Sequence, residues 1–165
     1  MRAIVVATAL AGCSFDHGAD PGHDAAMSPG DRTPDVAGAA ACLAASTHSY
    51  GGHHYFATLA GSRATCETSC EAVAGHLVKI ESADENDDLA TAFGLTGNTY
   101  LWIGLWDPSG TDTYVWQDGS ALSTAYNGFQ DMVVPGSSQN CVDSDGTWSA
   151  FSCSSANHGG ICECE

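Results

Sequence analysis

Eight cysteines are the residues whose number and spacing point most directly to chemistry. A chain of 165 residues that is kept reduced rarely carries so many thiols, so their number indicates an exported protein stapled by disulfides. Zinc is the alternative use of clustered thiols, and it requires paired Cys-x-x-Cys or Cys/His knuckles. The closest spacings, Cys66 with Cys70 and Cys162 with Cys164, have no matching second half, so we expect disulfides.

Carboxylates are the second group of residues able to bind a ligand. Asp131, Asp143 and Asp145 lie near one another in the sequence, and calcium requires a dense set of oxygen ligands. No cofactor is predicted firmly; if the chain binds a metal at all, these three are its candidate ligands and calcium is the candidate ion. A turn between strands is the simpler explanation of Asp145, because Gly146 follows it.

Charge and motifs exclude two classes of function. The chain has 20 acidic and 4 basic residues, for a net charge of -16, and these scattered cations cannot form the basic stripe that nucleic acid requires. The sequence contains no HExxH segment, no GxSxG elbow and no glycine-rich phosphate loop. We therefore expect neither a nucleic-acid partner nor an enzyme.

The N-terminus has the features of an export signal. Residues 1–12 contain an arginine and then an apolar run too short to span a bilayer, which predicts a signal peptide. The last of these residues and Cys13 read Leu-Ala-Gly-Cys, which resembles the bacterial lipobox, where the cysteine carries a lipid. The alternative is a plain secretory signal with an unrelated cysteine. Lipidation of Cys13 predicts a protein at the cell surface or outer envelope, attached to the membrane only through this anchor.

Residues 13–41 have the composition of a linker. They are rich in Asp, Gly, Ala and Pro, and the prolines break any helix. We expect a disordered linker over 13–41 and one folded domain over 42–165, a length that suits a single core.

The first half of this domain alternates strand and helix. A strand over 55–59 precedes a helix that Ser62 caps and Gly75 ends. A strand over 76–80 then leads to a second helix, which begins with a capping box at Ser82.

The second half contains short strands and loops. Strands are predicted over 100–105 and 114–116, and then around Cys141, Trp148 and Ile161. Helices in one half and antiparallel strands in the other indicate an α+β fold, with two helices packed on short antiparallel sheets.

Five separated motifs resemble the signature of the C-type lectin-like domains in order and spacing. The match covers the chain from Tyr55 onward and implies the C-type lectin-like fold, with a long loop. The motifs are the segments 70–86, 102–105, 118–119 and 146–148, and the ending from Cys153 to Glu163.

The resemblance also implies disulfides. The two framework pairs of the family fall on Cys70 with Cys162 and on Cys141 with Cys153. If Cys13 carries a lipid, one of the three remaining cysteines has no intramolecular partner. Because the two ends of this fold are expected to lie together, we favour a bond between Cys42 and Cys164. The alternative is a bond between Cys66 and Cys164.

The resemblance further implies where a calcium-dependent sugar site would lie. Sugar-binding members of the family use a Glu-Pro-Asn type segment, an acidic residue before a framework cysteine, and an Asn-Asp pair after a tryptophan. The matching positions here carry no carboxylate, so we expect this site to be lost. They are Val134-Pro135-Gly136, Gln139 and Ser149-Ala150.

The tryptophans divide into two groups. Trp102, Trp116 and Trp148 occupy positions that the family buries, so we expect them in the core. Trp106 precedes Asp107-Pro108, where we expect a turn and an exposed ring able to stack on a ligand. The candidate ligand-binding residues are Trp106, Asp131, Gln139, Asp143 and Asp145.

These observations predict a noncatalytic extracellular binding module that recognises a glycan or a protein without the usual calcium-sugar site. The alternative is a structural spacer of the cell envelope that binds no small ligand. Fold alone does not decide between them.

Overall fold

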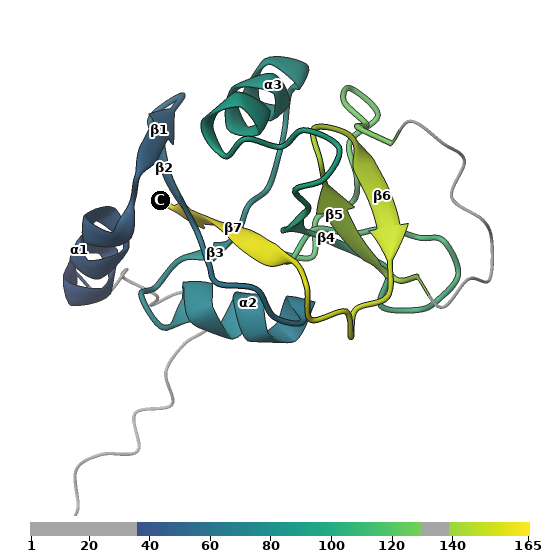
Figure 1. Cartoon of the computed structure of the whole chain (residues 1–165), viewed down its shortest axis with the longest axis horizontal. Helices are drawn as coiled ribbons and strands as arrows, with labels where there is room; N and C mark the ends of the chain where they lie inside the picture. Colours follow the sequence, from purple (N-terminus) through teal and green to yellow (C-terminus); the bar gives the residue numbers. More distant parts are fainter. Residues whose placement is uncertain (1–35, 130–138) are drawn as a thin grey trace, which may run out of the picture. The chain divides into compact units, whose positions relative to one another are not determined.

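The structure is a computed structural model that describes residues 36–129 and 139–165. This part of the chain contains three helices and seven strands, an α+β arrangement in which the short strands predominate (Figure 1). The helices are α1 (Val36–Ala45), α2 (Arg63–Glu71) and α3 (Ala83–Ala92). The strands are β1 (His48–Tyr50), β2 (His53–Ala57), β3 (His76–Leu77), β4 (Leu101–Trp106), β5 (Cys141–Ser144), β6 (Trp148–Phe151) and β7 (Gly159–Cys164).

The two helices predicted from capping residues begin where expected. The Ser62 hydroxyl accepts a hydrogen bond from the Thr65 N–H at the start of α2, and Ser82 does the same at the start of α3. The predicted end of α2 was wrong. The helix ends at Glu71, and the residue in the left-handed conformation is Ala74, with φ 60°, not Gly75.

Gly75 has a different role from the predicted one. A Cβ at this position would lie 2.8 Å from Cys42 Sγ and 2.9 Å from Glu163 O. The chain needs glycine here because α2 is followed by a close approach to β7 and to the disulfide of α1.

Helix α1 was missed by the sequence analysis, which placed residues 36–41 in the linker. The helix consists largely of alanine, a strong helix former, and begins two residues after Pro34. Its inner side is held by Cys42, which is fully buried and bonded to Cys164. The rest of the predicted signal peptide and linker, residues 1–35, lies outside the described residues.

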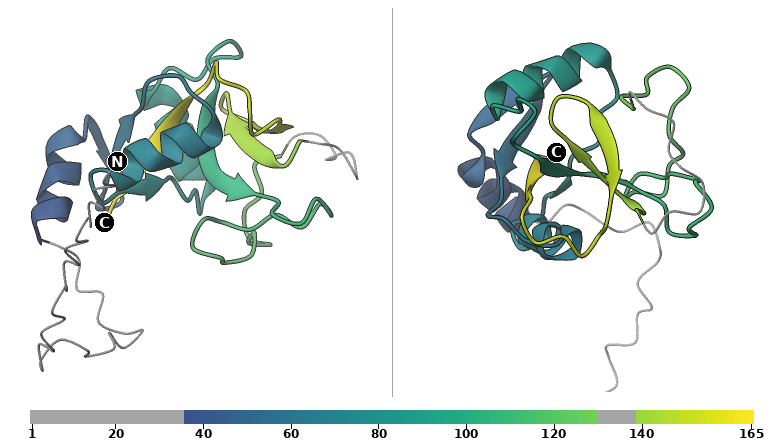
Figure 2. Two further views of the ribbon diagram at one scale, coloured as in Figure 1. Left: turned by 90° about the horizontal axis from the view of Figure 1, so that it is seen from below. Right: turned by 45° about the vertical axis from the view of Figure 1, so that its right-hand side comes forward.

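The sheet is organised around β7. The strand order is β1-β2-β7-β4-β5-β6, with β3 also paired to β7. Strand β7 runs antiparallel to β2 and β3 and parallel to β4, so the C-terminal strand joins the two halves of the domain. Helices α2 and α3 lie on opposite sides of this strand (Figures 1 and 2).

The predicted strand over 114–116 does not form a regular strand. Val115 makes isolated bridges to Trp106 and to Ala121, and the segment is otherwise loop. The backbone groups of Trp116 close the turn through Asp118, because its N–H donates to Ser120 O and its C=O accepts from Gly119.

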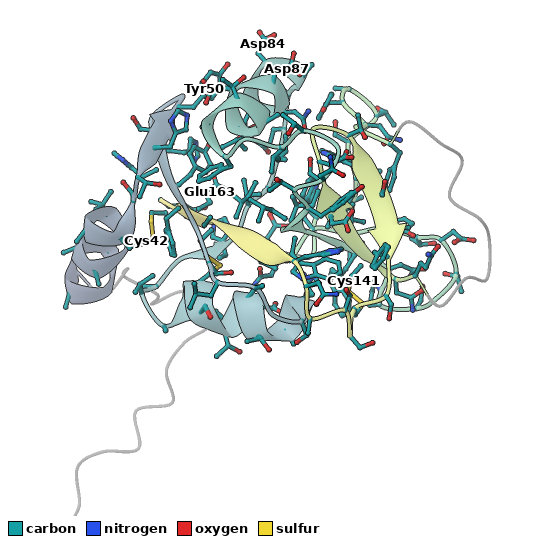
Figure 3. The ribbon with its side chains drawn as sticks, in the orientation of Figure 1. Cys42, Tyr50, Asp84, Asp87, Cys141 and Glu163 are labelled. Atoms are coloured by element: carbon teal, nitrogen blue, oxygen red, sulfur yellow. A yellow bond between two sulfur atoms is a disulfide. The ribbon has the colours of Figure 1, made fainter. Side chains whose placement is uncertain are left out.

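Three disulfides cross-link the described part of the chain. They are the pairs favoured above, Cys42 with Cys164, Cys70 with Cys162, and Cys141 with Cys153. The one free cysteine among the described residues is Cys66, which is fully buried. Figure 3 shows Cys42 beside the C-terminal end of β7.

The apolar side chains form two clusters on the two faces of the sheet. The larger contains Val78, Leu89, Val142 and Trp148, with α3 on its outer side. The smaller is packed under α2 and contains most of the buried cysteines together with Trp102. Trp102, Trp116 and Trp148 are all buried, as predicted.

Candidate functional site

Trp106 is the last residue of β4 and does not stand in a turn. Its N–H and C=O pair with Val115, which extends the strand up to Asp107. The ring is half-buried, and the Arg63 guanidinium carbon lies 5.2 Å from the ring centroid. The expectation of an exposed ring in a turn was therefore wrong, because pairing with Val115 and packing against α2 keep the residue within the sheet.

The three candidate metal ligands are not presented as an open calcium site. Asp143 is 1% exposed, and Asp145 accepts hydrogen bonds from the N–H and hydroxyl of Thr147 inside the β5–β6 turn. Asp131 lies outside the described residues, as does the segment 134–136. Among residues 36–129 and 139–165, no group of three or more His, Cys, Asp or Glu side chains is placed to hold a metal ion.

The remaining positions of the family's calcium site carry poor ligands. Gln139 is exposed, and its backbone oxygen accepts a hydrogen bond from the Tyr114 hydroxyl at 3.2 Å. Ser149 and Ala150 follow Trp148 inside β6, where Ala150 is packed against the larger core cluster. An alanine methyl group cannot ligate calcium.

Asp143 instead forms a buried pair with a histidine. His158 Nδ1 lies 2.9 Å from Asp143 Oδ2, and their side chains are 10% and 1% exposed. Burial, reinforced by the charge of Asp145, raises the pKa of Asp143 to about 7. Burial also lowers the pKa of His158. The two groups therefore favour a state with little net charge.

Three aromatic rings surround this histidine. The ring centroids of Trp102, Phe151 and Tyr100 lie 4.8, 5.0 and 5.4 Å from that of His158. Trp102 is buried, whereas Tyr100 and Phe151 are each 38% exposed. We call Tyr100, Phe151 and His158 the aromatic site.

A separate cavity of about 340 Å³ lies beside β3 and β7. Its most buried acid, Glu163, is 4% exposed, and burial raises its pKa. The cavity is lined by His53, His76, Leu77, Lys79, Glu81, Trp116, Gln117, Asp118, Glu163 and Glu165. Figure 3 shows Glu163 at the end of β7 that lies near Cys42.

The charged groups of this cavity bind one another. Glu163 Oε1 lies 2.7 Å from His53 Nδ1, and Oε2 accepts a hydrogen bond from the Lys79 N–H. Lys79 Nζ donates to Asp118 at 2.9 Å. Hydrogen bonds from Ser120 and from Lys79 lower the pKa of Asp118 to about 2. A ligand entering here would have to replace these existing contacts.

The aromatic site was not predicted from the sequence. The signal available was the two-residue alternation that places Asp143 and Phe151 on the same face as Trp102, as the strand register requires. His158 stands outside the strands, in the loop before β7. Nothing in the local sequence shows that this loop folds back over β5.

Comparison with known proteins assigns the family. The family model "Lectin C-type domain" matches residues 60–164, which is more than half of the chain and includes both candidate sites except for His53 and Glu165. The chain belongs to the C-type lectin domain family. Members of this family are nonenzymatic binding modules, and this domain is of that kind.

The similar curated proteins are animal lectins. The chain is 35% identical over 104 residues to the alpha-N-acetylgalactosamine-specific lectin of Patiria pectinifera, with 55% of this chain and 59% of that protein covered. It is 33% identical over 92 residues to the CD209 antigen-like protein 2 of Macaca mulatta, with 54% and 36% covered. The chain thus matches about a third to three fifths of the length of these relatives.

Solved structures show the same fold. The carbohydrate-recognition domain of the mouse scavenger receptor C-type lectin aligns with a TM-score of 0.60 and 27% identity, covering 70% of this chain and 91% of that one. The cow CD23 domain, solved in the presence of a GlcNAc2Man3 oligosaccharide, aligns with a TM-score of 0.57 and 28% identity, covering 69% and 88%.

None of the helices within residues 36–129 and 139–165 is long and apolar enough to cross a membrane.

Proposed function

We propose that this domain is an extracellular binding module that recognises a glycan without the calcium-sugar site of its family. The observation that carries the proposal is the pair Ser149-Ala150 after Trp148, because neither residue supplies the carboxylate and amide oxygens of an Asn-Asp pair. Burial of Asp143 removes another candidate oxygen ligand from the surface.

A glycan is favoured over a protein as the ligand by the relatives. One is an alpha-N-acetylgalactosamine-specific lectin; of the similar structures, one is a complex with GlcNAc and another was solved in the presence of a GlcNAc2Man3 oligosaccharide. The net charge of -16 further favours a ligand without acidic groups, since an anionic sugar would be repelled.

A glycan array tests this proposal directly. The whole protein is applied once with calcium and once with EDTA, and binding to the same neutral glycans at the same strength is expected in both. Binding that EDTA abolishes would show that a calcium site operates. Binding to no glycan under either condition would leave a protein ligand or a structural spacer.

We also propose that the domain is exported and anchored by a lipid on Cys13, within residues that the structure does not describe. This rests on the Leu-Ala-Gly-Cys segment alone. The similar proteins are animal lectins and give a bacterial lipoprotein type no support. Radiolabelled palmitate should label the wild-type protein and not Cys13→Ser in a bacterial host, and equal labelling of both would refute the anchor.

A further inference from the structure

Two exposed aromatic rings beside one histidine are unusual on this surface. Within the described residues, the large apolar side chains that are exposed are Leu43, Leu59, Tyr100 and Phe151. The only two aromatic ones both lie against His158. Apolar side chains that gather at the surface in this way mark binding sites more often than scattered ones do.

The strands place these rings without any contribution from the long loop. Trp102 on β4 lies directly opposite Asp143 on β5, which lies opposite Ser149 on β6. Phe151, two residues further along β6, shares that face because side chains alternate along a strand. His158 lies immediately before β7, whose first residue pairs with β4. Phe151 thus lies in β6, and Tyr100 and His158 lie directly before β4 and β7.

The buried carboxylate sets the orientation of the imidazole. Asp143 Oδ2 lies 2.9 Å from His158 Nδ1, and both atoms are buried, although their angles are not those of a hydrogen bond. With Nδ1 facing Asp143, Nε2 is the nitrogen left for a ligand. A carboxyl group beside one imidazole nitrogen fixes the tautomer of the ring and leaves the other nitrogen free to hydrogen-bond a ligand.

These features match the chemistry of a sugar ring. A pyranose has an apolar face of C–H groups, which stacks on aromatic rings, and a rim of hydroxyls, which donate and accept hydrogen bonds. Tyr100 and Phe151 provide the ring surfaces, and the imidazole of His158, in contact with both rings, provides a hydrogen-bonding nitrogen. Two half-exposed rings are too small for a stable protein interface, which buries about 800 Å² on each partner.

We propose that Tyr100, Phe151 and His158 bind a neutral pyranose ring of the glycan ligand, without metal, on the face of the β4–β5–β6 sheet. The inference rests on the proposed function, because it assigns the glycan its binding site. Asp143 acts as a positioning residue that holds His158 and does not touch the sugar.

The test compares ring-removing variants with a matched control. Binding of neutral glycans in EDTA is measured for wild type, Tyr100→Ala, Phe151→Ala and Leu43→Ala. Leu43 lies on α1 and is 44% exposed, so its removal matches the loss of exposed apolar surface. We expect at least tenfold weaker binding for the two aromatic variants and less than a twofold change for Leu43→Ala. Tyr100→Phe, which keeps the ring, should bind like the wild type.

The outcomes separate this site from the proposed function. If the wild type binds glycans in EDTA and both aromatic variants bind equally well, the site is wrong and the function stands. If the wild type binds no glycan, the function itself is wrong. Should an alanine variant unfold, NMR of the wild type decides, because the ring resonances of His158 must shift when the bound glycan is titrated in. Unchanged His158 resonances on saturation would overturn the proposal.

Discussion

A carboxylate buried among aromatic rings costs free energy unless it is neutralised. Asp143 faces His158 on one side, and the other charged group near it is Asp145, whose negative charge adds to the cost of ionisation. Tyr100 is the remaining titratable group of this cluster, and its ring stacks on His158. The folded protein therefore holds a proton on Asp143 more tightly than the unfolded chain does.

Asp143→Asn tests this at the level of stability. The pKa of Asp143 is raised to about 7 in the folded protein, whereas an aspartate in the unfolded chain has a pKa of about 4. Between pH 4 and pH 7 the folded protein therefore binds a proton that the unfolded chain has released, and the contribution of Asp143 to stability falls as the pH rises. From pH 5 to pH 8 we expect the wild type to lose about 2 kcal/mol through this group. Between pH 5 and pH 8, the free energy of unfolding of Asp143→Asn should therefore rise relative to that of the wild type by the same amount.

The measurement is urea denaturation of both proteins at the two pH values. Taking the difference between variant and wild type removes the contributions of other titrating groups, Glu163 included. His158 does not cancel in this way, because it contacts Asp143 and the substitution changes its surroundings; its lowered pKa opposes the effect below about pH 6.5. A difference that does not change with pH would show that Asp143 is ionised throughout.

Trp106 and Arg63 stabilise the region between β4 and α2. The guanidinium is 5% exposed, lies over the indole, and donates to Glu67 Oε2 at 2.9 Å. We expect Trp106→Ala to lower the free energy of unfolding by about 3 kcal/mol, because it removes buried packing and the indole ring on which the Arg63 guanidinium lies. Trp106→Phe should cost about 1 kcal/mol. Thermal unfolding of the two variants tests this structural role. If Trp106 were an exposed ligand-binding residue, as expected from the sequence, both variants would be as stable as the wild type.

Close contacts between elements restrict β4 at one position. A Cβ on Gly104 would lie 2.7 Å from Leu77 O and 3.0 Å from Val78 O, and both are backbone atoms that cannot move aside. We expect Gly104→Ala to cost about 3 kcal/mol in the free energy of unfolding. Gly94→Ala is the control. It has φ 63° and no atom within 4 Å of its Cβ, so it should cost about 1 kcal/mol through backbone strain alone. Equal costs in chemical denaturation would show that β4 can move away from β3.

The helices and strands with strong local signals were predictable. Ser62 and Ser82 cap helices because their hydroxyls accept from N–H groups three residues later, an interaction that depends on neighbours in sequence. Trp102 and Trp148 were placed in the core through family resemblance and are buried. Helix α1 was missed because its stability comes from Cys42 and its bond to the far end of the chain.

The candidate site was much less predictable than the fold. Asp143 was found as a polar residue near the expected ligand loop, but its burial depends on a register that pairs it with Trp102. His158 contacts it across a sequence separation that no local pattern encodes, and Trp106 is held by a cation from helix α2. Residues whose roles depend on tertiary contacts cannot be assigned from periodicity or spacing.

At the scale of the whole molecule, three disulfides tie the strands together. Cys42–Cys164 and Cys70–Cys162 both attach to β7 and span 122 and 92 residues of sequence. The third bond, Cys141–Cys153, spans 12 residues and holds the start of β5 to the segment after β6. In the loop-entropy account, the longer loops contribute about 4 to 5 kcal/mol each and the short one about 3.

The three disulfides leave one free thiol. Which cysteine carries it distinguishes a Cys42–Cys164 bond from the alternative Cys66–Cys164 bond. In the full chain carrying Cys13→Ser, seven cysteines remain, of which six are in disulfides and Cys66 is free and buried. Alkylation without reductant should label no cysteine in the native protein and only Cys66 after denaturation, because burial shields the thiol. Peptide mass spectrometry locates the label. A label on Cys42 would mean that Cys66 is bonded to Cys164, which would detach α1 from the end of β7.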